Sequence, residues 1–463
     1  MSSAGGGSAL LRLPKTPTRK EVLAFVASSA SYGNLGLFIG AGFSKAVLNE
    51  TPGEEIALSW GDLLEKAAKK MHIKYASVSK VGVSYPEIAS AICKSHSKTQ
   101  KISFGASLRQ LKQEIASLTS WYPTDEQRQE YSRYLEAFDP SWIITTNYDL
   151  VIESLLTGRS TPLGPNDPLS APKGVVPVFH LHGVRTNPEE IIIAQEDYIT
   201  LFRPSEYRQM KLALTIKEST TLLLGYALGD VNVLTALDWS RNVFRGERKN
   251  YPNAVVQVVR KEDPEEAAYR TRNGVVIIET NELSAFFEEF IEARKKVARQ
   301  EKKEQEALEK LAAKLNSPRG SMIEKFIDDE ESRAETLKML SESSIHLVAG
   351  FVTFLDKCID ETYRRSAPSG AFRGYGQNLA IILDIFTAFP IESFPPALFQ
   401  KAAYGLERVG YYVGDSPGQS WAAKRTWDSR ARELSPEIIN ELRNVAAQYG
   451  YMYVKKLLSA IPT

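Results

Sequence analysis

The chain has 463 residues, of which 43% are hydrophobic, 57 are lysine or arginine and 56 are aspartate or glutamate. At ~100–200 residues per domain this length predicts two or three domains, and the near-neutral charge argues against direct nucleic-acid binding. Two cysteines, Cys93 and Cys358, exclude a disulfide framework and suit a reducing cytoplasm.

Residues 1–15 are expected to form a flexible N-terminal tail. Residues 1–8 are rich in glycine and serine and lack the basic start and apolar segment of a signal peptide. No apolar run in the chain approaches the ~20 residues that a helix needs to cross a bilayer. These patterns predict a cytoplasmic protein that does not bind a membrane.

A buried strand is expected at residues 35–39, after a helix that begins at Thr16 and Pro17. The strand runs into a side-chain-poor turn, Gly-Ala-Gly at 40–42, and Ser44 can open the next helix. Backbone amides at such a helix start attract phosphate. The turn lacks the third glycine of the dinucleotide fingerprint and is not a Walker loop, so by itself it also fits an ordinary α/β turn.

The middle of the chain alternates between helical and strand patterns. Apolar residues at helical spacing, among them Leu63, Ala67 and Met71, predict a helical insertion over about 60–134. The apolar runs that follow predict a Rossmann-like, doubly wound, mostly parallel α/β sheet in a domain over residues 16–291. Its later strands are expected at 142–146, 175–181, 190–194, 220–224, 254–259 and 274–279.

The last third of the chain is expected to be helical. Residues 292–318 are rich in lysine, glutamate, alanine and glutamine, which predicts a solvated linker helix, with a coiled-coil contact as the alternative. Residues 319–463 have almost no strand pattern and predict an all-α C-terminal domain for assembly or regulation. Its helices are expected at 345–364, 377–389, 396–412 and 436–460.

Small or polar residues follow several of the expected strands. Parallel sheets collect their ligand groups at the carboxyl ends of strands, so these residues are candidates for a site. Asn147 could orient a neutral water with its amide, or cap a helix that begins at Tyr148 or Asp149. Asp149 could equally be a first-turn charge that complements the helix dipole.

Two histidines lie close together at the end of the strand expected at 175–181. His182 directly precedes Gly183, and His180 lies two residues earlier. An imidazole with a pKa near ~6.5 can take a proton from a hydroxyl or a water at neutral pH. A metal site would need a third ligand, and none is evident in the sequence.

The order of these segments resembles the sirtuin (silent-information-regulator) superfamily, in its prokaryotic NAD-hydrolase branch of anti-phage defence. The resemblance extends over residues 20–290 or so, and residues 191–198 also look like the stretch that follows the histidine in that branch. The segments that carry it are Gly40-Ala41-Gly42-Phe43-Ser44, Thr145-Thr146-Asn147-Tyr148-Asp149, Leu181-His182-Gly183 and Gly225-Tyr226-Ala227-Leu228-Gly229-Asp230.

The resemblance implies NAD as the substrate and suggests a role for each residue. Asn147 would hold the ribose and the attacking water, and Asp149 would hold the nicotinamide carboxamide. The family's histidine directly precedes glycine, so His182 would take the proton and His180 would be structural. The expected cofactor-binding residues are Gly40, Ala41, Gly42, Ser44, Thr146, Gly183, Gly225 and Asp230, the last of which could equally be a helix cap.

The leading interpretation is an NAD glycohydrolase that releases nicotinamide and ADP-ribose and depletes cellular NAD as a gated anti-phage effector. Gating would come from homo-oligomerisation or from a partner, which the resemblance suggests is a HerA-like translocase ATPase or a short Argonaute. Two cysteines cannot build the zinc module of deacetylating sirtuins, so no zinc is expected. The alternatives are an NAD-dependent protein deacylase or ADP-ribosyltransferase, and a non-enzymatic NAD or ADP-ribose sensor.

Overall fold

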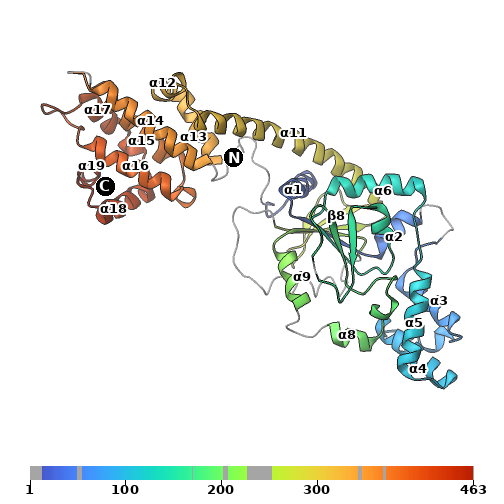
Figure 1. The fold of residues 1–463 in the computed structure, drawn as a ribbon. Coiled ribbons are helices and arrows are strands. Elements are labelled where there is room, and N and C mark those ends of the chain that lie inside the picture. The colour runs from blue at the N-terminus through green and yellow to red at the C-terminus, as the bar shows by residue number, and fades with distance from the viewer. Residues whose placement is uncertain are drawn as a thin grey trace. The chain divides into compact units, whose positions relative to one another are not determined.

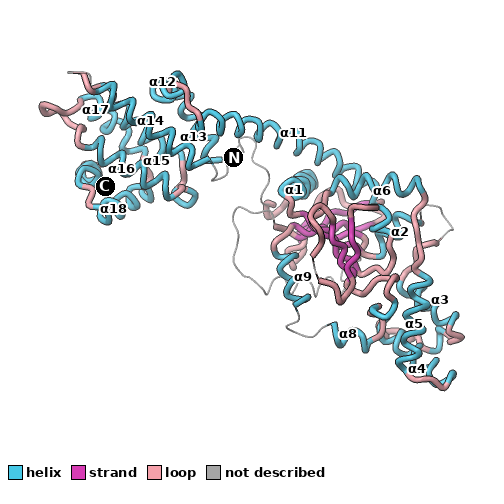
Figure 2. Tube along the Cα trace, in the orientation of Figure 1, coloured by secondary structure: helices cyan, strands magenta, loops and turns pink. Residues whose placement is uncertain are grey.

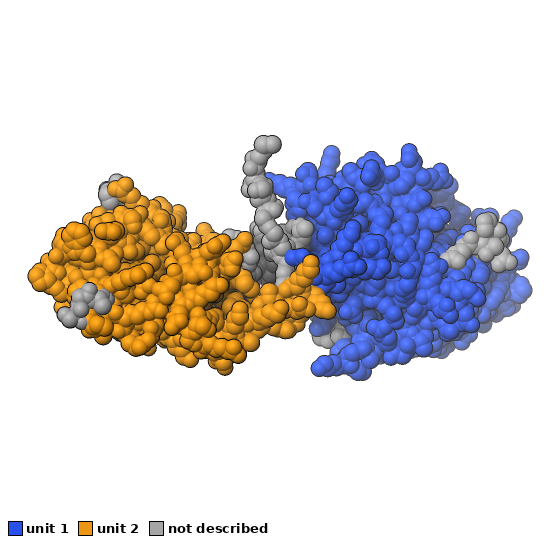
Figure 3. Space-filling view, turned by 90° about the horizontal axis from the view of Figure 1, so that it is seen from above, with its two compact units in different colours: residues 1–301 blue, residues 302–463 orange. Residues whose placement is uncertain are grey.

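The computed structural model describes residues 13–49, 55–168, 170–201, 207–226, 253–342, 347–368 and 372–461. The chain divides into two compact units, residues 1–301 and 302–463, which are coloured separately in Figure 3. Within the described residues, no helix combines the length and the apolar character needed to cross a membrane.

The first unit is built on an eight-stranded sheet with the order β3-β4-β2-β1-β5-β6-β8-β7 (Figure 2). All neighbouring strands are parallel except β7 and β8. The predicted doubly wound, mostly parallel sheet is therefore confirmed. The strands are β1 Leu35–Ile39, β2 Trp142–Thr145, β3 Ser160–Leu163, β4 Val176–His180, β5 Thr220–Leu224, β6 Val255–Arg260, β7 Tyr269–Arg270 and β8 Val276–Thr280.

Two differences from the predicted strands have physical causes. The strand expected at 190–194 is wrong: a short 3-10 turn, Pro188–Glu190, is followed by irregular chain. Its apolar side chains are buried against helices, a burial that looks the same in sequence as burial in a sheet. The unpredicted strands β3 and β7 are edge strands with partly exposed residues, so their apolar signal is weak.

Helices cover both faces of this sheet because side chains alternate along each strand. On β1, Leu37 and Ile39 pack in one cluster with α1 (Arg19–Tyr32), α2 (Ala41–Leu48) and α6 (Asp125–Phe138), whereas Phe38 packs in another with α9 (Tyr207–Lys217). Figure 1 shows α1 and α6 on one side of the sheet and α9 on the other.

The first helix begins later than expected. Thr18, not Thr16, is the N-cap, and α1 starts at Arg19. The Thr18 side chain accepts a hydrogen bond from the Glu21 amide, while the Glu21 carboxylate accepts one from the Thr18 amide. This reciprocal capping box satisfies two amides that the start of the helix would otherwise leave without a partner.

Three further helices form a small layer of their own. They are α3 Trp60–Lys70, α4 Tyr85–Gln100 and α5 Phe104–Leu118, and they bury a separate apolar cluster that also contains Tyr148 and Ile191. The insertion was expected to run to residue 134, which lies inside α6, and α6 packs with the sheet core. The three-helix layer thus attaches to the loops that follow β2 and β4.

The second unit is all-helical in its described part, as its sequence pattern indicates. Gly450, with φ +74°, divides the helix expected at 436–460 into two, and three helices (α12, α13 and α17) were not predicted. The charged segment is helical as expected, within α11 (Leu283–Asn316), and the boundary between the two units falls inside this helix. The helices of the unit are α12 Gly320–Asp328, α13 Glu330–Glu342, α14 Val348–Ser366, α15 Arg373–Ala388, α16 Pro396–Gly410, α17 Trp421–Arg430, α18 Pro436–Tyr449 and α19 Met452–Ser459.

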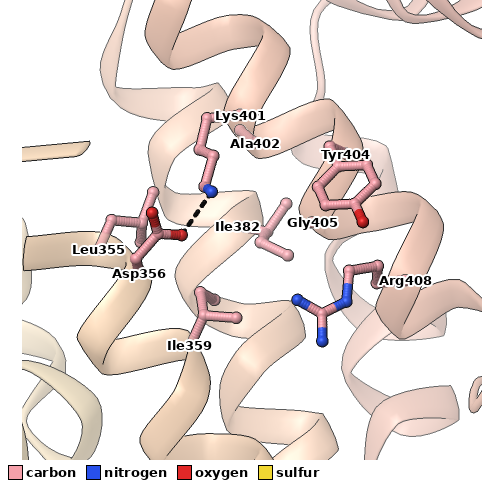
Figure 4. Close-up of a pocket in the computed structure, with 9 residues that line it drawn as sticks. All are labelled: Leu355, Asp356, Ile359, Ile382, Lys401, Ala402, Tyr404, Gly405 and Arg408. Carbon is pink, nitrogen blue, oxygen red and sulfur yellow. Dashed lines mark ion pairs between the residues drawn. The ribbon is translucent and has the colours of Figure 1, made fainter. Parts of the chain in front are cut away.

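A small pocket lies where α14, α15 and α16 meet (Figure 4). Lys401 closes one side of it through an ion pair with Asp356, at 2.5 Å. On the other side, the Arg408 guanidinium lies 4.7 Å from the centre of the Tyr363 ring. The two positively charged side chains of this pocket, Lys401 and Arg408, thus already contact neighbouring side chains, and the pocket belongs to the packing of the three helices.

Gly40, Gly42 and Gly225 let the turn after β1 approach the end of β5. A Cβ on Gly42 would lie 2.8 Å from the Gly225 carbonyl oxygen, and a Cβ on Gly225 would lie 2.2 Å from the Phe43 nitrogen. Gly225 also has φ +71°, a conformation that side chains disfavour. The contact is sealed by a hydrogen bond from the Gly42 amide to the Gly225 carbonyl, at 3.0 Å.

Replacement of Gly225 should therefore destabilise the first unit more than replacement of a glycine with equal strain and free space. Gly158 is the matched control, because it has φ +76° and no atom within 4 Å of the position that a Cβ would take. We expect Gly158→Ala to cost about 1–2 kcal/mol of unfolding free energy and Gly225→Ala at least about 3 kcal/mol. Urea unfolding followed by circular dichroism measures both, and equal costs would contradict the close approach.

Candidate active site

Four neighbouring strands, β4, β2, β1 and β5, have carboxyl ends that lie in register. Ile39 of β1 pairs with Thr145 of β2 on one side and with Leu224 of β5 on the other. Thr145 in turn pairs with His180 of β4. The chain segments that follow these residues therefore leave the sheet at the same level, and they contain the candidate residues from all four motifs.

A chain of hydrogen bonds links three candidate residues across two of these segments. The Asn147 side-chain nitrogen, Nδ2, lies 3.0 Å from the Ser44 hydroxyl oxygen. That hydroxyl lies 3.2 and 3.1 Å from the two carboxylate oxygens of Asp149. All three side chains are buried. The structure therefore brings Ser44 together with Asn147 and Asp149, although Ser44 is far from both in sequence.

The chemistry of these groups determines which of them donates in each hydrogen bond. An ionised carboxylate only accepts hydrogen bonds, so the Ser44 hydroxyl donates its single proton to Asp149. The same oxygen must then accept from Asn147, which places the amide nitrogen of Asn147 on the Ser44 side. The amide oxygen of Asn147 consequently faces away from Ser44, as a group that accepts hydrogen bonds.

The helix-cap alternative for Asn147 does not hold, because its side chain contacts Ser44. The helix expected at Tyr148 or Asp149 begins instead at Val151, as α7 (Val151–Leu155). Asp149 does serve this helix, since one carboxylate oxygen accepts from the Val151 amide at 3.1 Å. Asp149 thus combines a capping contact with its contact to Ser44.

Asp149 is a buried carboxylate with an altered acidity. Burial raises the pKa of Asp149 to about 6, and the charge of nearby Glu153 acts in the same direction. The Val151 amide, His180 and Ser44 favour the ionised form and oppose this rise. Asp149 therefore titrates close to the physiological range.

His182 lies two residues beyond β4, in a turn that Gly183 completes with φ +86°. The His182 ring is buried, and its Nε2 atom lies 3.3 Å from the Tyr198 hydroxyl on α8 (Gln195–Leu201). The Trp60 ring stacks on its face with ring centres 6.0 Å apart. The three-helix layer and α8 therefore hold this ring in place.

Thr146 contacts a residue from the end of β5. Its hydroxyl lies 2.9 Å from that of Tyr226, which in turn donates to the Ile39 carbonyl at 3.1 Å. This pair spans the end of β1 beside Gly40, where a Cβ would lie 3.0 Å from the Tyr226 ring. Thr146, Gly40 and Gly225 are thus gathered in one place, as the sequence predicts.

The turn after β1 uses several of its amides within the protein. The amides of Gly40, Gly42 and Phe43 donate to the carbonyls of Leu224, Gly225 and Gly40, respectively. Within the described residues, the Ala41 amide donates to no backbone carbonyl. Phosphate binding at this turn stays a prediction, and in this conformation Ala41 is the amide best placed to provide it.

The remaining candidate residues are Gly183 and Asp230. A Cβ on Gly183 would lie 2.6 Å from the Glu190 carbonyl oxygen, so its glycine is required by packing as well as by its φ value. Asp230 lies outside the described residues, so its contact with the adenosine half of NAD stays a prediction.

A metal at the histidine pair finds no support in the geometry. Both ring nitrogens of His180 are engaged, one by the Asn147 carbonyl and one by Glu153. In the part of the chain that the structure describes, no group of three or more His, Cys, Asp or Glu side chains is arranged to hold a metal ion.

Sequence reasoning missed four residues that surround the candidates. Trp60 and Tyr198 contact His182, Tyr226 contacts Thr146, and Glu153 contacts His180. Tyr226 lies within a quoted motif and Glu153 lies four residues after Asp149, so their nearness was a usable signal. Tyr198 ends the stretch 191–198 that carries part of the resemblance, so it too had a usable signal. Trp60 comes from a distant helix, and no local pattern marks it.

Comparison with known proteins identifies a domain in the first unit. Residues 141–278 match the family model of the SIR2-like domain, and this stretch contains Asn147, His182 and Gly225. No curated protein is similar enough to the chain to count as a match. The domain supports an NAD-related function of the sirtuin kind. Residues 141–278 therefore contain a SIR2-like domain, which supports a sirtuin-like superfamily assignment.

Proposed function

We propose that the protein is an NAD glycohydrolase, which cleaves NAD to nicotinamide and ADP-ribose. The observation that carries this proposal is the hydrogen-bond chain from Asn147 through Ser44 to Asp149, at the edge of the sheet where His182 also lies. A protein that only bound NAD would need neither an oriented amide nor an imidazole at this edge.

The reaction breaks the bond between the ribose C1 carbon and the nicotinamide nitrogen. The bonding electron pair goes to the ring nitrogen and leaves neutral nicotinamide, while the ribose develops oxocarbenium character. A water oxygen then bonds to C1 and loses a proton. In our proposal the oriented amide oxygen of Asn147 holds this water or the ribose, and His182 accepts the proton.

The structure favours a changed role for Asp149. Its carboxylate is 3% exposed and contacts both the Ser44 hydroxyl and the Val151 amide. We therefore assign Asp149 to the orientation of Ser44, and through it of Asn147, in place of the nicotinamide carboxamide contact expected from the sequence.

We further propose that the activity is gated, because an unrestrained hydrolase would exhaust the NAD of its own cell. The resemblance supports a cytoplasmic effector of anti-phage defence that is controlled by self-assembly, or by a partner such as a HerA-like translocase ATPase or a short Argonaute. The helical second unit is the part that we assign to this control.

Asn147→Ala should abolish NAD hydrolysis by the activated protein. Loss of one polar group that positions reacting atoms lowers a rate on the order of 10²–10³-fold. Asn187→Ala is the matched control, because Asn187 is exposed in the loop that follows His182. Chromatography of nicotinamide and ADP-ribose, with NAD as the only substrate, measures the effect.

The same assay separates the competing functions. Hydrolysis without an acylated peptide supports the glycohydrolase, whereas turnover that requires such a peptide would support a deacylase. NAD binding without turnover, in the presence of the proposed partner, would leave only a sensor. High turnover by a purified monomer would contradict the gating proposal.

Asp149→Asn should make the protein more stable at neutral pH. The pKa of Asp149 is raised from 3.8 to about 6, so the folded state binds this proton more tightly than the unfolded state. Wild-type stability therefore falls as pH rises from about 4 to about 6, by at most about 3 kcal/mol, and Asp149→Asn removes this loss.

Thermal unfolding at pH 4.5–8, about evenly spaced, measures this difference, with the exposed Asp263→Asn as control. The gain of Asp149→Asn over wild type should grow up to about pH 6 and stay constant above it. A gain that is independent of pH would contradict the raised pKa of Asp149, and a gain that keeps growing up to about pH 8 would contradict an Asp149 that is ionised at neutral pH. The test measures stability because activity would not separate two causes. If hydrolysis requires a neutral His182, activity would rise with pH just as it would if hydrolysis required an ionised Asp149.

A further inference from the structure

His180 lies beneath the Asn147 loop with both ring nitrogens engaged. Its Nδ1 atom is 2.8 Å from the backbone carbonyl oxygen of Asn147, and its Nε2 atom is 2.8 Å from a carboxylate oxygen of Glu153 on α7. The His180 side chain is fully buried, and that of Glu153 is 12% exposed. The ring therefore joins the loop that holds Asn147 to the helix that follows it.

The two contacts restrict where protons lie. A carbonyl oxygen only accepts hydrogen bonds, so the Nδ1 atom must carry a proton. A carboxylate also only accepts, so contact with ionised Glu153 requires a second proton, on Nε2. The contacts fit an imidazolium paired with a carboxylate, and also a neutral ring that accepts from a carboxylic acid; the raised pKa of His180 favours the first.

Glu153 and Asp149 are the titratable groups that face this ring. Burial alone lowers the pKa of His180, but the charge and hydrogen bond of Glu153, the Asn147 carbonyl and the charge of Asp149 together outweigh it and leave the pKa raised. The second oxygen of Glu153 is buried and has no hydrogen-bond partner in the described part of the chain. His180 is thus the partner on which this carboxylate depends.

Asn147 is held at three points. Its backbone N–H donates to the Thr145 hydroxyl at 3.0 Å, its side-chain amide donates to the Ser44 hydroxyl, and its backbone carbonyl accepts from His180. Thr145 and Ser44 fix the residue from the side of β1, since the Thr145 hydroxyl donates to the Ile39 carbonyl. The His180 contact fixes it from the side of β4.

We propose that Glu153 keeps His180 doubly protonated. The His180 ring, through its hydrogen bond to the backbone carbonyl of Asn147, then sets the position of the Asn147 side-chain amide for reaction. The inference rests on the proposed NAD hydrolysis. It makes His180 and Glu153 positioning residues, and it replaces the expectation that His180 is merely structural.

The proposal predicts different outcomes for two changes at one position. In Glu153→Ala, His180 loses its acceptor, becomes neutral and can release the Asn147 carbonyl. In Glu153→Gln, the new amide can donate to the Nε2 atom of a neutral ring, so Nδ1 keeps its proton and the clamp survives without charge. Glu153→Gln should therefore rescue what Glu153→Ala loses.

Nuclear magnetic resonance of the full-length protein tests the proton directly, without any substrate. The sequence has five histidines, so ring carbon signals are few, and the His180 signal is the one missing in His180→Gln. We expect the wild-type ring to stay protonated well above pH ~6.5 and the ring in Glu153→Gln to titrate below it. A wild-type ring that titrates at or below pH ~6.5, or no change in Glu153→Gln, would overturn the pairing.

Kinetics test the positioning role. We expect Glu153→Ala to lower kcat by about ten- to a hundredfold, with KM changed by less than about twofold, and Glu153→Gln to recover most of the loss. Wild-type kcat should fall at high pH, when His180 becomes neutral, keeps its remaining proton on Nε2 for the Glu153 carboxylate and loses the Nδ1 proton that binds the Asn147 carbonyl. This decrease should be absent in Glu153→Gln.

The failures of the two proposals are distinguishable. If the wild type hydrolyses NAD and Glu153→Ala matches it, the positioning role is overturned and the proposed function stands. If the activated wild type does not hydrolyse NAD, the proposed function fails and the positioning role fails with it. The ring titration would then still determine whether Glu153 keeps His180 doubly protonated.

Discussion

The alignment of four parallel strand ends is the constraint on which the candidate site depends. Backbone hydrogen bonds set Ile39, Thr145, His180 and Leu224 at one level, and each is followed within five residues by a group of the site. A slip of one residue in any of these pairings would turn side chains to the other face of the sheet. The apolar residues on both faces oppose such a slip, because both faces are covered by helices.

The site places polar groups where water does not reach them, and each has a defined partner. Ser44, Asp149 and His180 are almost completely buried, yet each takes part in at least two hydrogen bonds. Unpaired polar groups at this depth would destabilise the fold. Hydrogen bonding stabilises these buried side chains and also restricts their rotation. The hydrogen bonds that the stability of the fold requires are therefore the same ones that hold Asn147 in a single orientation.

Much of the sheet was predictable because it is encoded locally, by apolar runs that end in small or polar residues. The strand at 220–224 and the convergence of Gly40, Thr146 and Gly225 follow from such patterns. The apolar run at 190–194 was misread because burial against helices leaves the same local signal as burial in a sheet. The contact of His182 with Trp60 could not be predicted, since it joins segments that only the folded chain brings together.

The place of β1 in the sheet has a consequence for any attempt to excise the domain. This strand lies between β2 and β5, yet it precedes the stretch that matches the SIR2-like family. A fragment limited to residues 141–278 would carry two half-sheets with no central strand to join them, and it would also lack the Ser44 hydroxyl. Reconstitution of such a fragment would require a second piece that supplies residues 35–48. The strand in this piece would have to form backbone hydrogen bonds with β2 on one side and with β5 on the other.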